Sequence, residues 1–411
     1  MSVRSLFLLC GLVLIPQGAE AASYYPELLY RYDHHLMTLN PNEFPFWRKT
    51  EEVWHYNGVE IRPDASLRTD GDSTPPLPEG VTRTLRSVWN TDAIAATIAQ
   101  RVATVIDRPR GIVSIDKNDE GNIVFDGVGF RGRTVEIVKA ATLTIAALEH
   151  SVTDIHLPVR EEQPVIHVLH PDLQDRGIAE VIAIGESNFA HSATSRRHNI
   201  ATGVHKFNGH TVPQGSVFSF NEVLGPVTGE TGYLKELVIL GDKTLPDYGG
   251  GLCQVSTTAY RGVWEYGFPI VQRRNHSFAV QYYAPQGTDA TIYPPYTDIK
   301  FLNDSPGDLL IQTHVSGDKA YFIYYGTKDK RDAEVVGPFV WDKRPPPADR
   351  VEYTSDLLPG ERKQVGKAVS GMQAAWFRIV RNGDDQEVIE PFYSYYEARP
   401  NYTQIGGQPE P

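Results

Sequence analysis

The sequence predicts an α+β fold divided among several domains, and three observations support this prediction. The chain has 411 residues, which is enough for two or three domains of roughly 150 residues each. Its 29 prolines and 35 glycines favour short strands and turns over long helices. Two segments nevertheless repeat apolar residues at helical spacing, and a third such segment follows three consecutive glycines.

The first 21 residues have the pattern of a secretory signal peptide. Arg4 supplies a positive charge, Leu6–Ile15 is a short apolar stretch, and Ala19-Glu20-Ala21 is a cleavage site of the A-x-A kind. The apolar stretch is too short to cross a bilayer, which makes an uncleaved anchor the weaker alternative. We therefore expect an exported protein of the periplasm or the extracellular cell wall, with no membrane span after cleavage.

The acidic composition restricts the classes of partner. The formal net charge is −12, which disfavours nucleic-acid binding and adhesion to anionic lipid because both need a basic surface. The negative charge does not exclude carbohydrate or peptide ligands. The sequence indicates no oligomeric state.

Local patterns divide the rest of the chain into segments of different character. Residues 22–84 are rich in tyrosine, proline and aspartate and have no clear fold. Residues 85–172 have the pattern of a small α+β module. Helices are predicted there at Asp92–Ile106 and Thr134–His150, a hairpin at Ile112–Asp126 and a strand at Asp154–Val159.

The second half of the chain carries the candidate functional motifs. We predict a domain at 185–328, which holds all of these motifs. Residues 329–349 are predicted to be a linker, because Arg344 is followed by three prolines that stiffen the chain. Residues 350–408 have the pattern of a small β module made of short strands with glycine turns.

Cleavage of the signal peptide would leave one cysteine, Cys253, because the other cysteine is Cys10. An odd cysteine in an exported protein has no intramolecular disulfide partner and is a candidate reactive thiol. The alternative is an inert, buried side chain that acts as a small hydrophobe. The local sequence favours the reactive thiol.

Cys253 is predicted in the first turn of a helix, directly after Gly249, Gly250 and Gly251. Val255, Ala259 and Val263 form the apolar stripe of this helix. The positive end of a helix dipole favours a thiolate, and free amides near Gly251–Gln254 can hold a developing oxyanion. Phosphate binding is the weaker interpretation, since no lysine follows the glycines.

A candidate base and its orienting group follow in the chain. His276 begins an alternating segment in which Phe278, Val280 and Tyr282 are predicted to share one strand face with it. An imidazole beside a thiolate serves as its ion-pair partner and proton carrier. Asp289 is a candidate to orient that imidazole, with an Asx turn as the alternative.

Two further interpretations concern charged and metal-binding groups. Arg273 is a candidate to bind a substrate carboxylate, since the guanidinium fork suits that group. His191, His198 and His205 recur at intervals of seven but lack carboxylates at ligand spacing, so we predict no metal and no organic cofactor. His198 is an alternative to His276 as the base.

Together these motifs resemble the VanW domain family, over about 140 of the 411 residues. Gln214 departs from the family pattern, which usually has glycine there, and we expect little consequence. The matching pieces are Asn199-Ile200-Ala201, Phe207-Asn208-Gly209, Val212-Pro213-Gln214-Gly215, Phe218-Ser219-Phe220-Asn221, Gly232-Tyr233, Gly249-Gly250-Gly251-Leu252-Cys253-Gln254, Arg273, His276-Ser277, Gly287-Thr288-Asp289-Ala290 and Phe301-Leu302-Asn303.

The resemblance implies a cysteine L,D-transpeptidase that cross-links peptidoglycan stem peptides, with Cys253 as nucleophile and His276 as its partner. Residues 85–172 resemble a peptidoglycan-binding module that often precedes such catalytic domains, and residues 350–408 weakly resemble the G-five β module. Two alternatives stay open: a cysteine peptidase or amidase that hydrolyses peptidoglycan peptides, and a wall-binding protein without catalysis.

Overall fold

The computed structural model describes residues 24–62, 78–240, 243–383 and 386–407. The predicted signal peptide lies outside the described residues. The chain forms two compact units, each described by itself below. The first comprises Met1–Tyr30, Thr38–Thr97 and Val138–Ile155, and the second comprises Arg31–Met37, Ile98–Ile137 and His156–Pro411.

The first unit combines a three-stranded antiparallel sheet with two helices. The sheet has the order β4-β3-β5, formed by β3 (Arg48–Tyr56), β4 (Val59–Ile61) and β5 (Val81–Trp89). The helices are α1 (Thr91–Ile98) and α3 (Ile137–Glu149). The indole of buried Trp47 donates to the Thr97 hydroxyl at 2.9 Å, so the polar edge of the ring is satisfied inside the core.

Several short elements complete the N-terminal half of the chain. Helix α1 continues as a π-helical turn, Ala99–Ala103, and then as α2 (Thr104–Ile106). The helices and the hairpin predicted between residues 92 and 150 are thus present. The remaining elements are β1 (Leu28–Tyr32), β2 (His35–Leu39), the 3-10 helices Pro41–Glu43 and Pro45–Trp47, β6 (Ile112–Lys117), β7 (Ile123–Gly127), β8 (Gly132–Val135), β9 (Asp154–His156), β10 (Val159–Glu162), β11 (Val165–Val168) and α4 (Pro171–Asp175).

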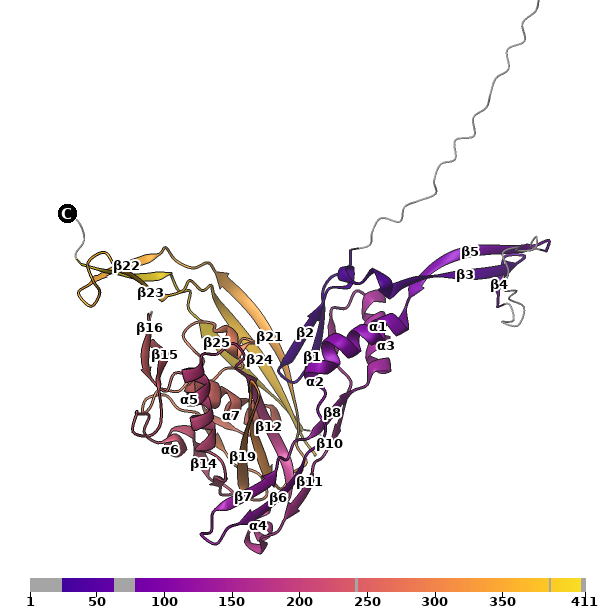
Figure 1. The fold of residues 1–411 in the computed structure, drawn as a ribbon. Helices are drawn as coiled ribbons and strands as arrows, with labels where there is room; N and C mark the ends of the chain where they lie inside the picture. The colour runs from indigo at the N-terminus through magenta and orange to yellow at the C-terminus, as the bar shows by residue number, and fades with distance from the viewer. Residues whose placement is uncertain (1–23, 63–77, 241–242, 384–385, 408–411) are drawn as a thin grey trace, which may run out of the picture. The chain divides into compact units, whose positions relative to one another are not determined.

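A four-stranded antiparallel sheet is the centre of the second unit. Its order is β12-β20-β19-β13, formed by β12 (Glu180–Asn188), β13 (Thr211–Val212), β19 (Leu309–Ser316) and β20 (Lys319–Gly326). Helices α5 (Thr194–His205) and α7 (Leu252–Tyr266) pack on this sheet (Figure 1). A Cβ atom on Gly185 would lie 1.9 Å from the Thr258 carbonyl oxygen, so glycine is needed where α7 crosses β12.

Smaller elements surround α7. A three-stranded sheet has the order β14-β18-β17, and β15 pairs with β16 as a hairpin. Their bounds, with one further helix and one 3-10 turn, are β14 (Val217–Ser219), α6 (Phe220–Leu224), β15 (Lys235–Leu240), β16 (Lys243–Tyr248), β17 (Ile270–Gln272), Gln281–Tyr283 and β18 (Lys300–Leu302).

The C-terminal strands belong to the second unit and reach its core. One sheet has the order β21-β24-β25, formed by β21 (Asp332–Arg344), β24 (Gly371–Asn382) and β25 (Gln386–Tyr396). Trp376 of β24 packs edge-on against Trp264 of α7, with ring centroids 5.5 Å apart. The other sheet has the order β22-β26-β23, formed by β22 (Arg350–Thr354), β23 (Arg362–Gly366) and β26 (Tyr402–Gly406).

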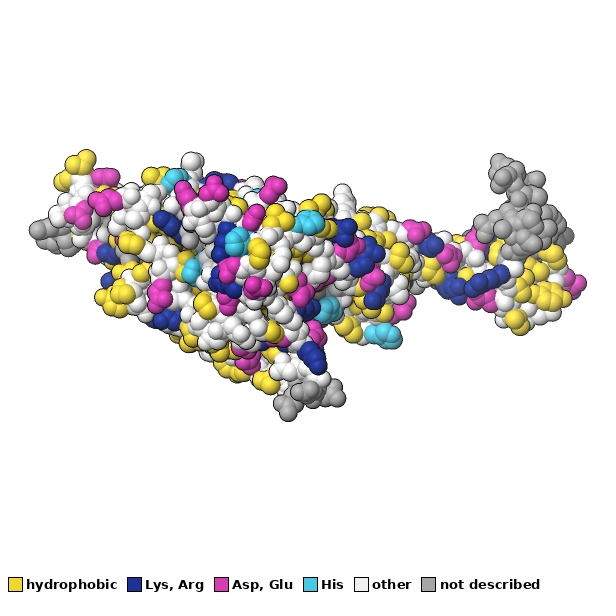
Figure 2. Space-filling model, turned by 90° about the horizontal axis from the view of Figure 1, so that it is seen from below, with side chains coloured by type: hydrophobic (Ala, Val, Ile, Leu, Met, Phe, Trp, Pro, Cys, Tyr) yellow, Lys and Arg dark blue, Asp and Glu magenta, His cyan; other side chains and the backbone are white. Residues whose placement is uncertain are grey.

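Strand β21 occupies most of the segment that we expected to be a linker. It pairs with β24 through two register shifts, and the three prolines follow its last residue, Arg344. The fold class is nevertheless α+β, since helices and several sheets are present. On the face in view in Figure 2, basic and acidic side chains are intermixed. Within the described residues, no helix has the length and apolar character that crossing a membrane requires.

Candidate active site

Helix α7 begins at Leu252, so Cys253 is its second residue. The three preceding glycines form the turn that leads into it. Gly249 and Gly251 have φ values of 81° and 114°, which other residues rarely adopt. Gly250 lies against β15, where an added Cβ atom would be 2.8 Å from the Leu237 carbonyl oxygen. The turn therefore needs glycine for conformation at two positions and for space at the third.

Asn199 of α5 fixes this glycine turn from the side. Its fully buried amide donates to the carbonyl oxygens of Leu234 at 2.9 Å and Gly250 at 3.1 Å, and its oxygen accepts from the Leu234 N–H at 2.8 Å. All of these bonds connect it to the backbone. Asn199 therefore sets the position from which α7 begins.

At the start of α7, the Cys253 amide is one of the backbone N–H groups that lack an acceptor within the described residues. The N–H groups of Leu252 and Gln254 donate to the Gly249 and Gly251 carbonyls at 3.0 and 2.9 Å. For the Cys253 N–H, the described part of the chain offers no acceptor. Among the amides that we expected to hold an oxyanion, the one on Cys253 itself is thus available.

His276 lies in a loop, so the predicted strand from His276 to Tyr282 was wrong. Strand β17 ends at Gln272, and the segment closes with the 3-10 turn Gln281–Tyr283. The polar groups of the loop find partners other than a neighbouring strand. The His276 N–H donates to Asp289 Oδ2 at 2.7 Å, and the Asn275 side chain donates to the Tyr395 carbonyl at 2.7 Å.

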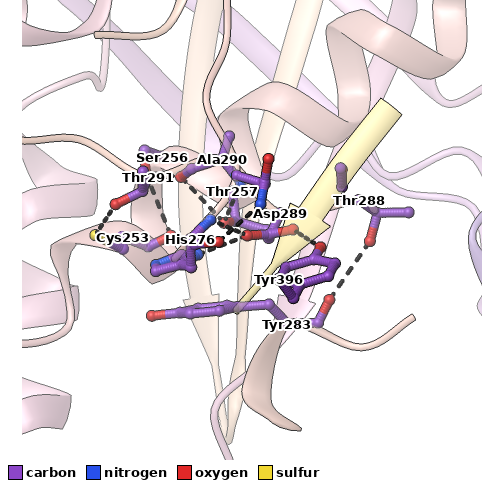
Figure 3. A network of polar contacts seen from close by, with 12 residues as sticks. Cys253, Ser256, Thr257, His276, Tyr283, Thr288, Asp289, Ala290, Thr291 and Tyr396 are labelled. Carbon is purple, nitrogen blue, oxygen red and sulfur yellow. Dashed lines mark hydrogen bonds and ion pairs between the residues drawn. The ribbon is translucent and has the colours of Figure 1, made fainter. Parts of the chain in front are cut away.

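The imidazole of His276 is held by Asp289. Its Nδ1 lies 2.6 Å from Asp289 Oδ2, and only 4% of the histidine and 2% of the aspartate are exposed. In Figure 3 the imidazole lies between the sulfur of Cys253 and the carboxylate of Asp289. The other ring nitrogen, Nε2, is buried and has no hydrogen-bond partner among the described residues. A buried polar atom without a partner is uncommon, and the group on this side of the ring is the Cys253 thiol, which raises the pKa of His276.

Asp289 has further partners that fix its second oxygen. The Tyr396 hydroxyl, from the end of β25, donates to Oδ1. Arg273 Nη2 lies 3.5 Å from the same oxygen. The pKa of Asp289 lies well below its usual range: burial opposes ionisation, but His276 and Arg273 outweigh it. Asp289 is therefore a permanent anion behind the imidazole.

Arg273, which we expected to bind a substrate carboxylate, uses its donors inside the protein. It donates to the carbonyls of Asp289 at 2.8 Å and Gly287 at 3.0 Å, and to the Ser394 hydroxyl at 2.9 Å. Its side chain is only 6% exposed. This arrangement orients the loop around Asp289 rather than facing a ligand.

The thiol of Cys253 is partly exposed and lies beside two oxygen atoms. Its sulfur is 3.4 Å from the Thr291 hydroxyl and 3.8 Å from the Ile292 carbonyl. Burial opposes ionisation of the thiol, but His276 and Thr291 outweigh it and lower the Cys253 pKa to about 7. Burial also opposes protonation of His276, but Asp289 and Cys253 raise its pKa to about 9. Near neutral pH the two side chains thus favour a thiolate and an imidazolium.

Other predicted site residues have different surroundings. Gln254 is fully buried, and its side chain accepts from Arg196 at 3.3 Å and donates to the Asn188 carbonyl at 3.4 Å. The alternative base, His198, is exposed on α5 and its Nε2 lies 2.8 Å from the Gly232 carbonyl oxygen. The structure thus places His276 beside the thiol and His198 in contact with another loop.

Sequence reasoning missed three residues that shape this site: Thr291, Tyr283 and Tyr396. The ring of Tyr283 stacks on the imidazole of His276 at a centroid distance of 4.4 Å. Thr291 follows Asp289 by two positions, a spacing that places alternate side chains on one side of an extended chain. No sequence signal connects Tyr396 to the site, since it is 107 residues from Asp289.

A cavity of about 770 Å³ lies within the same unit but is not lined by Cys253. Its walls include Gln281 and Tyr282, which come from the 3-10 turn beside His276, and Arg261, which lies two turns further along α7. The candidate chemistry is therefore at the start of α7, beside this cavity and not within it.

Comparison with known proteins places this site inside a recognised family region. Residues 195–325 match the family described as VanW like protein. The chain is 34% identical over 139 residues to the uncharacterized protein YoaR of Bacillus subtilis, covering 34% of this chain and 46% of that protein. It is 26% identical over 152 residues to the vancomycin B-type resistance protein VanW of Enterococcus faecalis, covering 36% of this chain and 50% of that protein. The chain thus spans about half the length of these relatives.

Proposed function

We propose that this chain, which carries a VanW-like domain at residues 195–325, is an exported cell-wall enzyme that transfers acyl groups between peptidoglycan stem peptides. The observation that carries the proposal is the arrangement of Cys253, His276 and Asp289, in which the imidazole lies between the thiol at the start of α7 and the carboxylate. One relative is named for vancomycin resistance, which supports a role in the same cell-wall context. The peptide substrate follows from the resemblance to VanW domains.

The first half of the proposed reaction forms a thioester. The Cys253 thiolate attacks the carbonyl carbon that precedes the last residue of a donor stem peptide. The oxyanion accepts a hydrogen bond from the free Cys253 N–H. The carbon–nitrogen bond then breaks, and the His276 imidazolium gives its proton to the departing amine. The terminal amino acid leaves, and the donor stays attached to sulfur.

The second half transfers the donor. An amine from an acceptor stem attacks the thioester carbonyl, and neutral His276 takes the proton of that amine. The carbon–sulfur bond breaks, which restores the thiolate and the imidazolium. Asp289 keeps the Nδ1 proton in place throughout, so that Nε2 faces the reacting atoms. The protein's own residues supply every proton transfer in this scheme.

Product analysis tests the proposal. Incubation of the purified protein with defined muropeptides should give cross-linked dimers and release the terminal amino acid. Both products should disappear in Cys253→Ala, whereas His198→Gln, which changes an exposed imidazole on α5, should keep them. Mass spectrometry of the products distinguishes the outcomes. Shortened monomers without dimers would support the hydrolase alternative, and products that persist in Cys253→Ala would contradict both enzymes.

A further inference from the structure

Arg196 is a cation without an acidic partner in the described part of the chain. It lies on α5 and is half-buried. Its Nη2 donates to Gln254 Oε1 at 3.3 Å and to the Tyr283 hydroxyl at 3.4 Å, and its Nη1 donates to the Ser192 hydroxyl at 3.4 Å. All three acceptors are neutral. The bonds are also longer than the 2.7–2.9 Å usual for charge-assisted pairs.

The next residue shows what a satisfied arginine in the same helix looks like. Arg197 Nη1 lies 2.5 Å from Asp318 Oδ1, and its Nε donates to the Ser192 carbonyl at 3.0 Å. The contrast indicates that no carboxylate of the described residues neutralises Arg196, so its guanidinium has capacity for a further partner. A guanidinium with free capacity prefers a carboxylate or a phosphate.

The position of Arg196 connects it to the reactive sulfur. An added Cβ atom on Gly251 would lie 3.1 Å from Arg196 Cγ, so the side chain passes over the first turn of α7. Its partner Tyr283 stacks on His276, and in Figure 3 the hydroxyl end of that ring points to the side where Cys253 lies. One helical turn rises about 5.4 Å, which is the length of one to two extended peptide residues.

The guanidinium is also held in place before any ligand arrives. It lies over the ring of Tyr282, 4.4 Å from the centroid. Such stacking restricts a long side chain, and the three long bonds to neutral acceptors leave the Nε donor and one Nη1 donor of the guanidinium without an acceptor among the described residues. A carboxylate that approached along the first turn of α7 would meet these donors.

We propose that Arg196 binds the terminal carboxylate of the residue that leaves during thioester formation. This inference rests on the proposed function and names the residue that recognises the free C-terminus of its donor peptide. When Arg196 binds this carboxylate, the carbonyl group of the preceding substrate residue is positioned over the sulfur of Cys253. A peptide that continues beyond this residue, or ends in an amide, has no negative charge at this position and cannot form the ion pair with Arg196.

The test compares one stem peptide with a free C-terminal carboxylate and the same peptide as its C-terminal amide. A hydrogen bond to a charged group corresponds to roughly a 10- to 100-fold preference, so acylation of Cys253 should favour the acid by this factor in kcat/KM. Arg196→Gln should remove the preference by raising KM for the acid while leaving the amide unchanged. Arg196→Lys should restore part of it. Arg197→Gln, the matched control, should keep the full preference.

A second measurement separates this inference from the proposed reaction. In Cys253→Ala, which forms no thioester, the dissociation constants of the acid and the amide still report on Arg196. Tighter binding of the acid by roughly 10-fold or more, lost in Cys253→Ala with Arg196→Gln, would support the inference even without turnover. Equal binding of the two peptides would overturn it, even if the enzyme transfers acyl groups.

Discussion

At the scale of single residues, burial and charge act in opposite directions on the thiol of Cys253. Burial alone would keep the thiol protonated, and the imidazole of His276 reverses this preference. Asp289 in turn keeps the imidazole protonated. The predicted reactivity of the sulfur therefore depends on two side chains that follow it in the sequence by 23 and 36 positions (276 − 253 and 289 − 253).

Because the thiolate is the reactive form of Cys253, the rate of its alkylation should increase with pH. Because the Cys253 pKa is lowered to about 7, the rate of alkylation by iodoacetamide should rise through a midpoint near pH 7, below the usual cysteine value of about 8.5. His276→Gln removes the strongest of the groups that oppose burial, leaving Thr291 and the Ile292 backbone, and should move the midpoint upward by at least one unit. His198→Gln is the control and should not move it. An unchanged midpoint in His276→Gln would contradict the coupling.

Local sequence was sufficient to predict part of this site. The glycine turn and the helix start could be predicted because both depend on neighbouring residues, and Asp289 was a candidate to orient the imidazole, with an Asx turn as the alternative. Tyr396 could not be predicted, since only the folding of β25 brings it to Asp289. That Arg196 has no acidic partner among the described residues could not be predicted either, because it depends on which carboxylates the fold places nearby.

At the scale of elements, the alternation from His276 to Tyr282 misled the prediction of a strand. Alternation shows which residues are compatible with a strand, but the strand forms only where a neighbour offers backbone partners. Here the Asp289 carboxylate takes the place of such a neighbour at the His276 N–H. For β21 the sequence misled in the opposite direction, because three prolines suggested a linker where a strand forms. The prolines come directly after the last residue of β21, and β21 pairs with β24.

Strand β25 contributes directly to the site through Tyr396. This hydroxyl donates to Asp289 and accepts from the Gly287 N–H at 2.7 Å, and the residue is only 2% exposed. Tyr396→Phe leaves both groups buried without this partner, so we expect a loss of about 1–3 kcal/mol in the free energy of unfolding. Urea denaturation measures this loss. Tyr393→Phe, on an exposed position of the same strand, should cost much less, and equal costs would contradict the assignment.

At the scale of the whole molecule, the C-terminal strands and the VanW-like region form one unit. Arg378 of β24 is buried and donates to the carbonyls of Trp264 and Phe268, both at 2.9 Å, at the end of the helix that carries Cys253 in its first turn. The structure thus holds α7 at both ends: Asn199 fixes the turn before it and Arg378 fixes its exit. The family match at 195–325 covers only the first of these contacts.

The most direct test of the central claim is the intact mass of the full protein after brief exposure to a stem peptide with a free C-terminus. The account predicts one adduct on Cys253, with a mass increase equal to the mass of the peptide minus that of the released terminal amino acid, that hydroxylamine removes as expected for a thioester. It also predicts no adduct in Cys253→Ala. An adduct located elsewhere, or release of the terminal residue by Cys253→Ala, would contradict the account.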